Sequence, residues 1–160
     1  MKKIGKVIVI FFLAIVSLCV PVALLLGVDA ICEDYNNGPK SARKHISFLT
    51  GIDVPQDAEI VYHFFHQYFQ GGEIIQYTVF SFDDDCSEWL QENKFQEDKS
   101  LEFEKKFNSN ISNLIEDKVS KEFFPDFTKE YLWFETKRAY FIYIKTSKKL
   151  IIYVPTHKFG

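Results

Sequence analysis

The sequence lacks the short motifs from which an enzyme class is usually predicted. It contains no G-x-S-x-G, which excludes hydrolases built on a nucleophile elbow. Its only glycine pair, Gly71-Gly72, is too short to cradle a phosphate and is typical of a hairpin turn. No internal repeat and no low-complexity tract is present, which excludes a solenoid and a compositionally biased chain. These absences leave a small globular domain as the expected body of the chain.

Charge is absent from residues 7–26, which read VIVIFFLAIVSLCVPVALLL. A hydrocarbon core about 30 Å thick needs roughly 20 helical residues, because each residue rises about 1.5 Å. We therefore predict a transmembrane anchor over residues 7–28, after a cytoplasmic N-terminus at residues 1–6. A juxtamembrane stem is expected at residues 29–38, and a single extracytoplasmic domain at residues 39–160.

The residues that flank the apolar run predict its orientation. Lys2, Lys3 and Lys6 precede the run, and basic residues stay on the cytoplasmic side of a membrane. The domain is thus expected outside the cytoplasm. The alternative is a secretory signal, because Val28-Asp29-Ala30 places small residues where a signal peptidase reads them and would permit cleavage after Ala30. Either reading puts the domain on the same side of the membrane, anchored in one case and secreted in the other.

Acidic residues are absent after Glu135. Residues 29–135 hold ten basic and 22 acidic residues, a balance of −12, whereas residues 136–160 hold six basic residues and no acidic one. This asymmetry has two explanations: attraction within the fold, or a contact with an anionic surface such as lipid headgroups. We favour the first, because the basic residues alternate with strand-like segments and do not form a block.

Cysteine is scarce, with three residues in the chain. Cys19 lies in the apolar run, whereas Cys32 and Cys86 are expected outside the cytoplasm. Two cysteines in an oxidising compartment favour a disulfide, which would join the stem to the domain. The alternative is two separate thiols, since cysteine is also common as a small buried residue.

The periodicity of apolar residues predicts an α+β fold in the order α-ββ-αα-βββ. The expected elements are a helix over 39–50, strands over 59–69 and 73–82, a short helix capped by Asp84 or Asp85 with Glu88 in a capping box, a longer helix from Ser100 to Val119, and strands over 130–135, 139–145 and 150–154. We expect an antiparallel sheet of about five strands, with the helices packed on one face.

The first two predicted strands carry bulky apolar side chains on both faces. Such a hairpin is either central in a sheet that is covered on both sides, or reserves one face for a partner. Phe65, Phe69 and Tyr77 are the candidate aromatic residues of a binding face. The chain holds 17 Phe, eight Tyr and two Trp, which is ample for one core and leaves aromatic side chains for a groove.

Three groups of residues are candidates for a chemical site. His63 and His66 are an odd number of residues apart on a predicted strand, so they should point to opposite faces and not share a metal ion. Asp83-Asp84-Asp85 lacks the alternating ligands and the closing Glu of a Ca²⁺ loop, which favours helix capping. Cys86 at a helix start is a candidate nucleophile, but the three neighbouring carboxylates oppose a thiolate.

Together these observations predict a non-catalytic binding or interaction module of the cell envelope, anchored in the membrane by one helix. We assign no catalytic residue, metal or cofactor, and we expect an envelope protein as the partner and no nucleic acid. The alternatives are a small hydrolase-like enzyme that uses Cys86 or a histidine, and a structural envelope protein. The ligand and the oligomeric state do not follow from the sequence.

Overall fold

The computed structural model describes residues 39–67, 74–111 and 113–157. The predicted anchor, the predicted stem and Phe69 lie outside the described residues. Within the described part of the chain, no helix is both long and apolar enough to cross a membrane.

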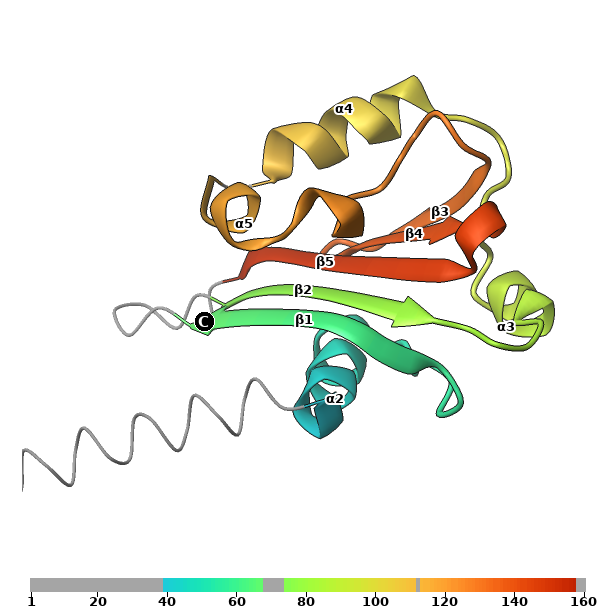
Figure 1. The fold of residues 1–160 in the computed structure, drawn as a ribbon, viewed down its shortest axis with the longest axis horizontal. Coiled ribbons are helices and arrows are strands. Elements are labelled where there is room, and N and C mark those ends of the chain that lie inside the picture. The colour runs from blue at the N-terminus through green and yellow to red at the C-terminus, as the bar shows by residue number, and fades with distance from the viewer. Residues whose placement is uncertain (1–38, 68–73, 112, 158–160) are drawn as a thin grey trace, which may run out of the picture. The chain divides into compact units, whose positions relative to one another are not determined.

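The described residues form a five-stranded antiparallel sheet with helices (Figure 1), which confirms the predicted α+β class. The strands lie in the order β1-β2-β5-β4-β3, and each neighbouring pair is antiparallel. The elements are α2 (Pro39–Thr50), β1 (Glu59–Gln67), β2 (Ile74–Ser81), α3 (Ser87–Glu92), α4 (Leu101–Asn110), α5 (Asn113–Lys118), η1 (Lys121–Phe123), β3 (Tyr131–Glu135), β4 (Tyr140–Ile144), η2 (Lys145–Ser147) and β5 (Lys149–His157).

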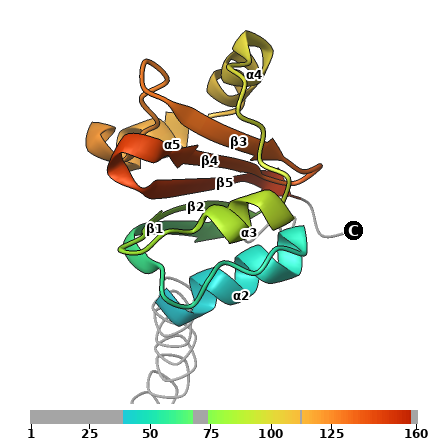
Figure 2. The same cartoon turned by 90° about the vertical axis from the view of Figure 1, so that its right-hand side faces the viewer.

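The helices cover both faces of the sheet, so the prediction that they pack on one face was wrong (Figures 1 and 2). One core lies between the sheet and the helices α2 and α3, with Ile46, Leu49 and Leu90 as helix residues. The other lies beneath α4 and α5, with Phe107 and Ile115. The strands carry apolar side chains on both faces of the sheet. A helix layer on each face is therefore needed to remove these side chains from water.

The single helix predicted from Ser100 to Val119 is two helices, α4 and α5. Its predicted start is confirmed, because the Ser100 side chain accepts a hydrogen bond from the Phe103 backbone N–H at 3.2 Å. The helix ends where Ile111 adopts an extended conformation, with φ −61° and ψ 120°. This break lets Phe107 and Ile115 both reach zero exposure on the same core.

The predicted cap of α3 is shifted along the chain. Cys86 is the N-cap residue and its side chain makes no capping bond. Asp85 instead accepts hydrogen bonds through Oδ1 from the Ser87 backbone at 3.0 Å and from the Ser87 hydroxyl at 2.5 Å. These bonds lower the pKa of Asp85. Asp85 therefore stabilises the start of this helix. The capping box predicted for Glu88 is not seen among the contacts of the described residues.

Candidate functional site: the two edges of the sheet

The sheet exposes two edge strands, β1 and β3, and the outer side of β3 is partly covered. The backbone of Trp133 exchanges two hydrogen bonds with that of Gln96: Gln96 N–H donates to Trp133 O at 2.8 Å, and Trp133 N–H donates to Gln96 O at 3.1 Å. The Trp133 indole also donates to the Asp98 carbonyl at 2.9 Å. The chain before α4 therefore acts as a short extra strand along one part of this edge.

The extra strand stops before it reaches Glu135. In an antiparallel sheet, successive residues of a strand direct their backbone N–H and C=O alternately to the strands on its two sides. Trp133 directs these groups away from β4, so Glu135, two residues later, does the same. Extending the Gln96–Trp133 register would place Lys94 opposite Glu135. Lys94 instead has a positive φ of 58° and donates its N–H to Gln91 O at 2.9 Å, which turns the chain away. Among the described residues, none takes the backbone position opposite Glu135.

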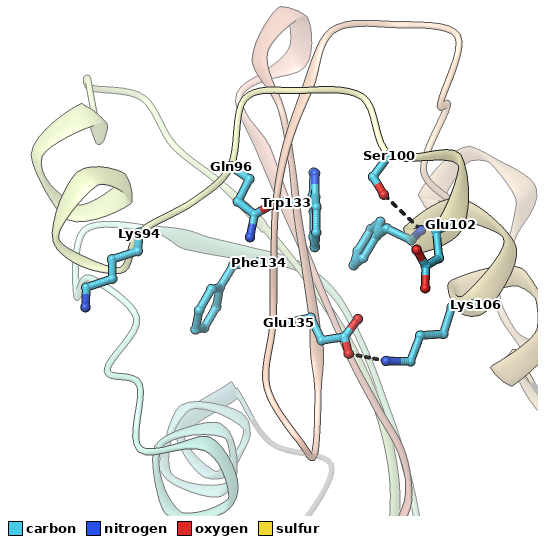
Figure 3. A pocket seen from close by; sticks show the side chains of 9 residues that line it. Lys94, Gln96, Ser100, Glu102, Lys106, Trp133, Phe134 and Glu135 are labelled. Carbon is cyan, nitrogen blue, oxygen red and sulfur yellow. Dashed lines mark hydrogen bonds and ion pairs between the residues drawn. The ribbon is translucent and has the colours of Figure 1, made fainter.

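A groove of about 530 Å³ lies at this place (Figure 3). Trp133, Phe134 and Glu135 of β3 line it, and Lys94 and Gln96 lie on the same side as Phe134. The side chains contributed by the start of α4 are Ser100, Glu102, Phe103 and Lys106. The groove thus combines aromatic walls, both signs of charge and an open segment of strand edge.

Contacts between β3 and α4 fix the wall of this groove. Trp133 packs on Phe103 with ring centroids 4.4 Å apart, and Lys106 forms an ion pair with Glu135 that raises the pKa of Lys106. Tyr131 donates a hydrogen bond to the Glu104 carboxylate at 2.7 Å. Burial, together with this carboxylate, raises the pKa of Tyr131 to about 12.

The other edge, β1, pairs with β2 on one side only within the described part of the chain. It spans nine residues, EIVYHFFHQ, and contains no Lys, Arg or Pro, the residues that commonly protect edge strands. The register shifts between Ile60 and Tyr62, and Val61 at this bulge is 38% exposed. β1 is therefore a long edge strand without Lys, Arg or Pro, and its register shift lies at Val61.

The aromatic residues predicted for a binding face have intramolecular partners. Phe65 is buried and stacks on His45 of α2, with ring centroids 5.0 Å apart. Tyr77 is fully buried and its hydroxyl donates to the Phe123 carbonyl at 2.9 Å. Phe69 lies outside the described residues. A partner that approaches this hairpin would meet its outer edge before the rings of Phe65 and Tyr77.

Cys86 is a buried free thiol. Burial raises its pKa, and its sulfur shares a hydrogen bond with Tyr143. A nucleophilic cysteine needs the opposite shift, because the thiolate is the reactive form. Cys32 lies outside the described residues, so the disulfide between the two cysteines stays a prediction.

The two histidines of β1 occupy different faces, as their spacing predicts. His63 Nδ1 lies 2.9 Å from the Thr78 hydroxyl, whereas His66 stacks near Phe64, a residue of the core beneath α4 and α5. Among the described residues, no group of three or more His, Cys, Asp or Glu is placed to hold a metal ion. Ser41 and Lys44 match a Ser-x-x-Lys spacing, but Ser41 is buried and Lys44 is exposed.

A small buried polar cluster lies between α2 and the hairpin. Gln76 is fully buried and donates to the Ala42 carbonyl and the Thr78 hydroxyl, both at 3.1 Å. The ring of His45 lies nearby in the same layer, where burial lowers its pKa from the ordinary value of 6.5. Gln76 thus bonds the hairpin to the backbone of α2, and His45 of the same helix packs on Phe65 of β1.

We expect the domain to lose stability as the pH falls from 7.5 to 5, partly through His45. Because the pKa of His45 is lower in the folded state, the unfolded chain binds the proton first. Stability is therefore full above pH 6.5 and falls as the pH drops below it. His45→Phe keeps a ring against Phe65 and should show a smaller fall in Tm between pH 7.5 and 5 than the wild type. An equal fall in the two proteins would contradict this role, since all other histidines are shared.

The described basic residues after Glu135 lie before and after β4. Lys137 and Arg138 lie in the turn before β4, and Lys148 lies in the turn after it. Arg138 donates to the Leu49 carbonyl at 3.5 Å, and Lys148 donates to the Asp83 carbonyl at 2.6 Å. Both contacts are made to backbone carbonyls and not to carboxylates, so the reason for the charge asymmetry stays a prediction.

Comparison of the chain with protein-family models, with curated proteins and with solved structures found no match.

Proposed function

We propose that this protein is a non-catalytic interaction module of the cell envelope, which binds its partner by adding a strand of that partner to the edge of β1. The observation that carries the proposal is the outer edge of β1, which is nine residues long, contains no Lys, Arg or Pro, and pairs with no other strand in the described part of the chain. An edge of this kind is a ready template for another chain, because its outer backbone groups need hydrogen-bond partners.

Strand addition suits the dimensions and the chemistry of β1. Nine residues extend about 30 Å at roughly 3.3 Å per residue, which gives room for several main-chain hydrogen bonds to a partner. The exposed Val61 and the half-buried Ile60 and Tyr62 supply apolar contacts beside that edge. Main-chain bonds would provide the affinity and these side chains the specificity.

The location of the partner follows from the apolar run of residues 7–26 and the lysines before it. An uncleaved anchor would hold the domain at the outer face of the membrane, within reach of an envelope protein. Cleavage after Ala30 would release the same domain without altering β1. The enzyme alternative based on Cys86 is disfavoured by the burial and raised pKa of that thiol.

The decisive experiment compares two exposed apolar residues at different places in the domain. Val61→Lys places a charge on the β1 edge, whereas Leu101→Lys places the same charge on α4, where the leucine is 71% exposed. We expect Val61→Lys to reduce the amount of partner that copurifies with the tagged full chain from native membranes by about tenfold, equivalent to about 1.4 kcal/mol. Leu101→Lys should leave the recovery unchanged.

A photo-crosslinking residue in place of Val61 tests the position of the contact directly. The partner should be captured from position 61 and not from position 101. Equal loss of partner in the two lysine variants, equal crosslinking from the two positions, or the absence of any reproducible partner would each overturn the proposal.

A further inference from the structure

We propose that the strand added to β1 is β1 of a second copy of this chain, so that two five-stranded sheets join into one across a two-fold axis. This inference rests on the proposed function of β1 and names its partner. It fails, while that function stands, if the added strand comes from another protein.

The charge of β1 suits a contact with its own copy. Self-association of a strand brings identical side chains close together, and like charges opposite each other on paired strands are destabilising. Glu59, at the first position, is the only acidic residue of β1, and the strand has no Lys or Arg. Two copies can therefore pair along residues 60–67 without placing charges of one sign opposite each other.

The geometry of an antiparallel pair restricts how two copies of β1 can align. Residues directly opposite each other either both direct their backbone N–H and C=O toward the other strand or both direct them away from it. These directions alternate along each strand, so opposite residues of two identical strands are separated by an even number of positions. A two-fold axis must then pass beside one residue, which faces the same residue of the second copy.

Phe64 is the residue that fits best at this axis. Tyr62, Phe64 and His66 alternate along β1, so their side chains share one face of the sheet, and all three are half-buried. When Phe64 faces Phe64 of the second copy, Tyr62 of each copy lies opposite His66 of the other. A centre at His63 would run through the register shift between residues 60 and 62, whereas a centre at Phe65 would leave Tyr62 opposite no residue of β1.

Contacts within the domain already hold these rings at the edge. Tyr62 stacks on Phe123 with ring centroids 4.5 Å apart, and its hydroxyl donates to the Lys118 carbonyl at 3.1 Å. Phe64 stacks on His66 with ring centroids 6.5 Å apart. Pairing therefore orders few additional side chains, which lowers the entropic cost of association. The predicted anchor would also confine two copies to one membrane and raise their effective concentration.

Photo-crosslinking tests the identity of the partner. The full chain carries p-benzoylphenylalanine in place of Phe64, an aromatic replacement, and is irradiated in native membranes. We expect an adduct of twice the mass of the chain, with the crosslink in residues 62–66 of the second copy by mass spectrometry. The same replacement at Leu101, on α4, should give no such adduct.

The outcomes of this crosslinking separate the two proposals. An adduct with a different protein from position 64, and none between two copies, would overturn this inference and leave the proposed function of β1 intact. The absence of any adduct from position 64 would overturn both. Equal adducts of two copies from positions 64 and 101 would also overturn this inference, because the contact would then not be specific to β1.

Charge variants at the axis test the register. Phe64→Glu and Phe64→Lys each place like charges opposite each other, so a tagged copy of either variant should retain at least tenfold less of its untagged copy than the wild type does. Tagged Phe64→Glu expressed together with untagged Phe64→Lys should restore the retention, because opposite charges then meet at the axis. Retention at the wild-type level in both single variants, or no recovery in the mixture of two variants that keep the wild-type circular dichroism spectrum, would contradict pairing about Phe64.

Discussion

Phe107→Ala is expected to lower the free energy of unfolding by about 3–5 kcal/mol. The Phe107 ring is fully buried at the centre of the core beneath α4. It makes edge-to-face contacts with Phe127, Tyr140 and Tyr153, with ring centroids 5.7, 5.7 and 5.8 Å apart. Truncation would leave a cavity that three rings from different segments cannot fill without moving, and a core relaxes only in part after such a loss.

The matched control is Phe48→Ala, which makes the same chemical change on α2. Phe48 is 74% exposed, so its truncation should change the stability by less than about 0.5 kcal/mol. Urea unfolding of the full chain, followed by the fluorescence of Trp89 and Trp133, measures both effects. Similar losses in the two variants would show that α4 is not held to the sheet by Phe107.

The secondary structure was largely predictable because each strand is strongly apolar and bounded by turn residues. The strand over 150–154 is an instructive exception, since β5 continues to His157 through Pro155. Proline disrupts a sheet ladder, but here the register between β2 and β5 shifts, with Ile74 opposite His157 and Gln76 opposite Val154. A bulge that depends on a distant strand leaves no local signal in the sequence.

The arrangement of the layers was less predictable than the elements. The number of aromatic residues predicts more rings than one core needs, but the sheet has two cores, and both are rich in aromatic rings. The sequence thus predicts Phe65 and Tyr77 for a binding face, whereas each has a partner in the fold. Which side of a strand a helix covers depends on long-range packing, which apolar periodicity alone does not reveal.

The groove beside Glu135 could not be found from the sequence for a similar reason. It depends on a bridge between Gln96 and Trp133, which are far apart in the chain, and on the positive φ of Lys94. The segment from 93 to 99 reads only as a polar connection, and lysine has no particular preference for that conformation. The length of β1 and its lack of Lys, Arg and Pro, in contrast, can be read from the sequence, whereas its position at the edge follows only from the strand order.

Arg43→Met is expected to lower the free energy of unfolding by about 2–3 kcal/mol, because it removes hydrogen bonds from a charged donor to several backbone carbonyls. The Arg43 guanidinium donates to Pro55 O at 2.6 Å, to Val54 O at 3.4 Å and to Ala58 O. It also lies over the Phe80 ring, 5.0 Å from the centroid. One side chain of α2 therefore fixes the connection that leads directly into β1.

Methionine retains much of the length and apolar surface of the arginine stem, so the loss should reflect mainly the carbonyls left without their donor. Lys44→Met is the control, because Lys44 is the exposed neighbour on the same helix and its loss should change the stability by less than about 0.5 kcal/mol. Hydrogen exchange should also become faster in residues 54–58 of Arg43→Met before it does in β4, since the freed connection would open locally. Equal stability of the two variants, or uniform exchange across the domain, would mean that packing of Ile46 and Leu49 alone positions the start of β1.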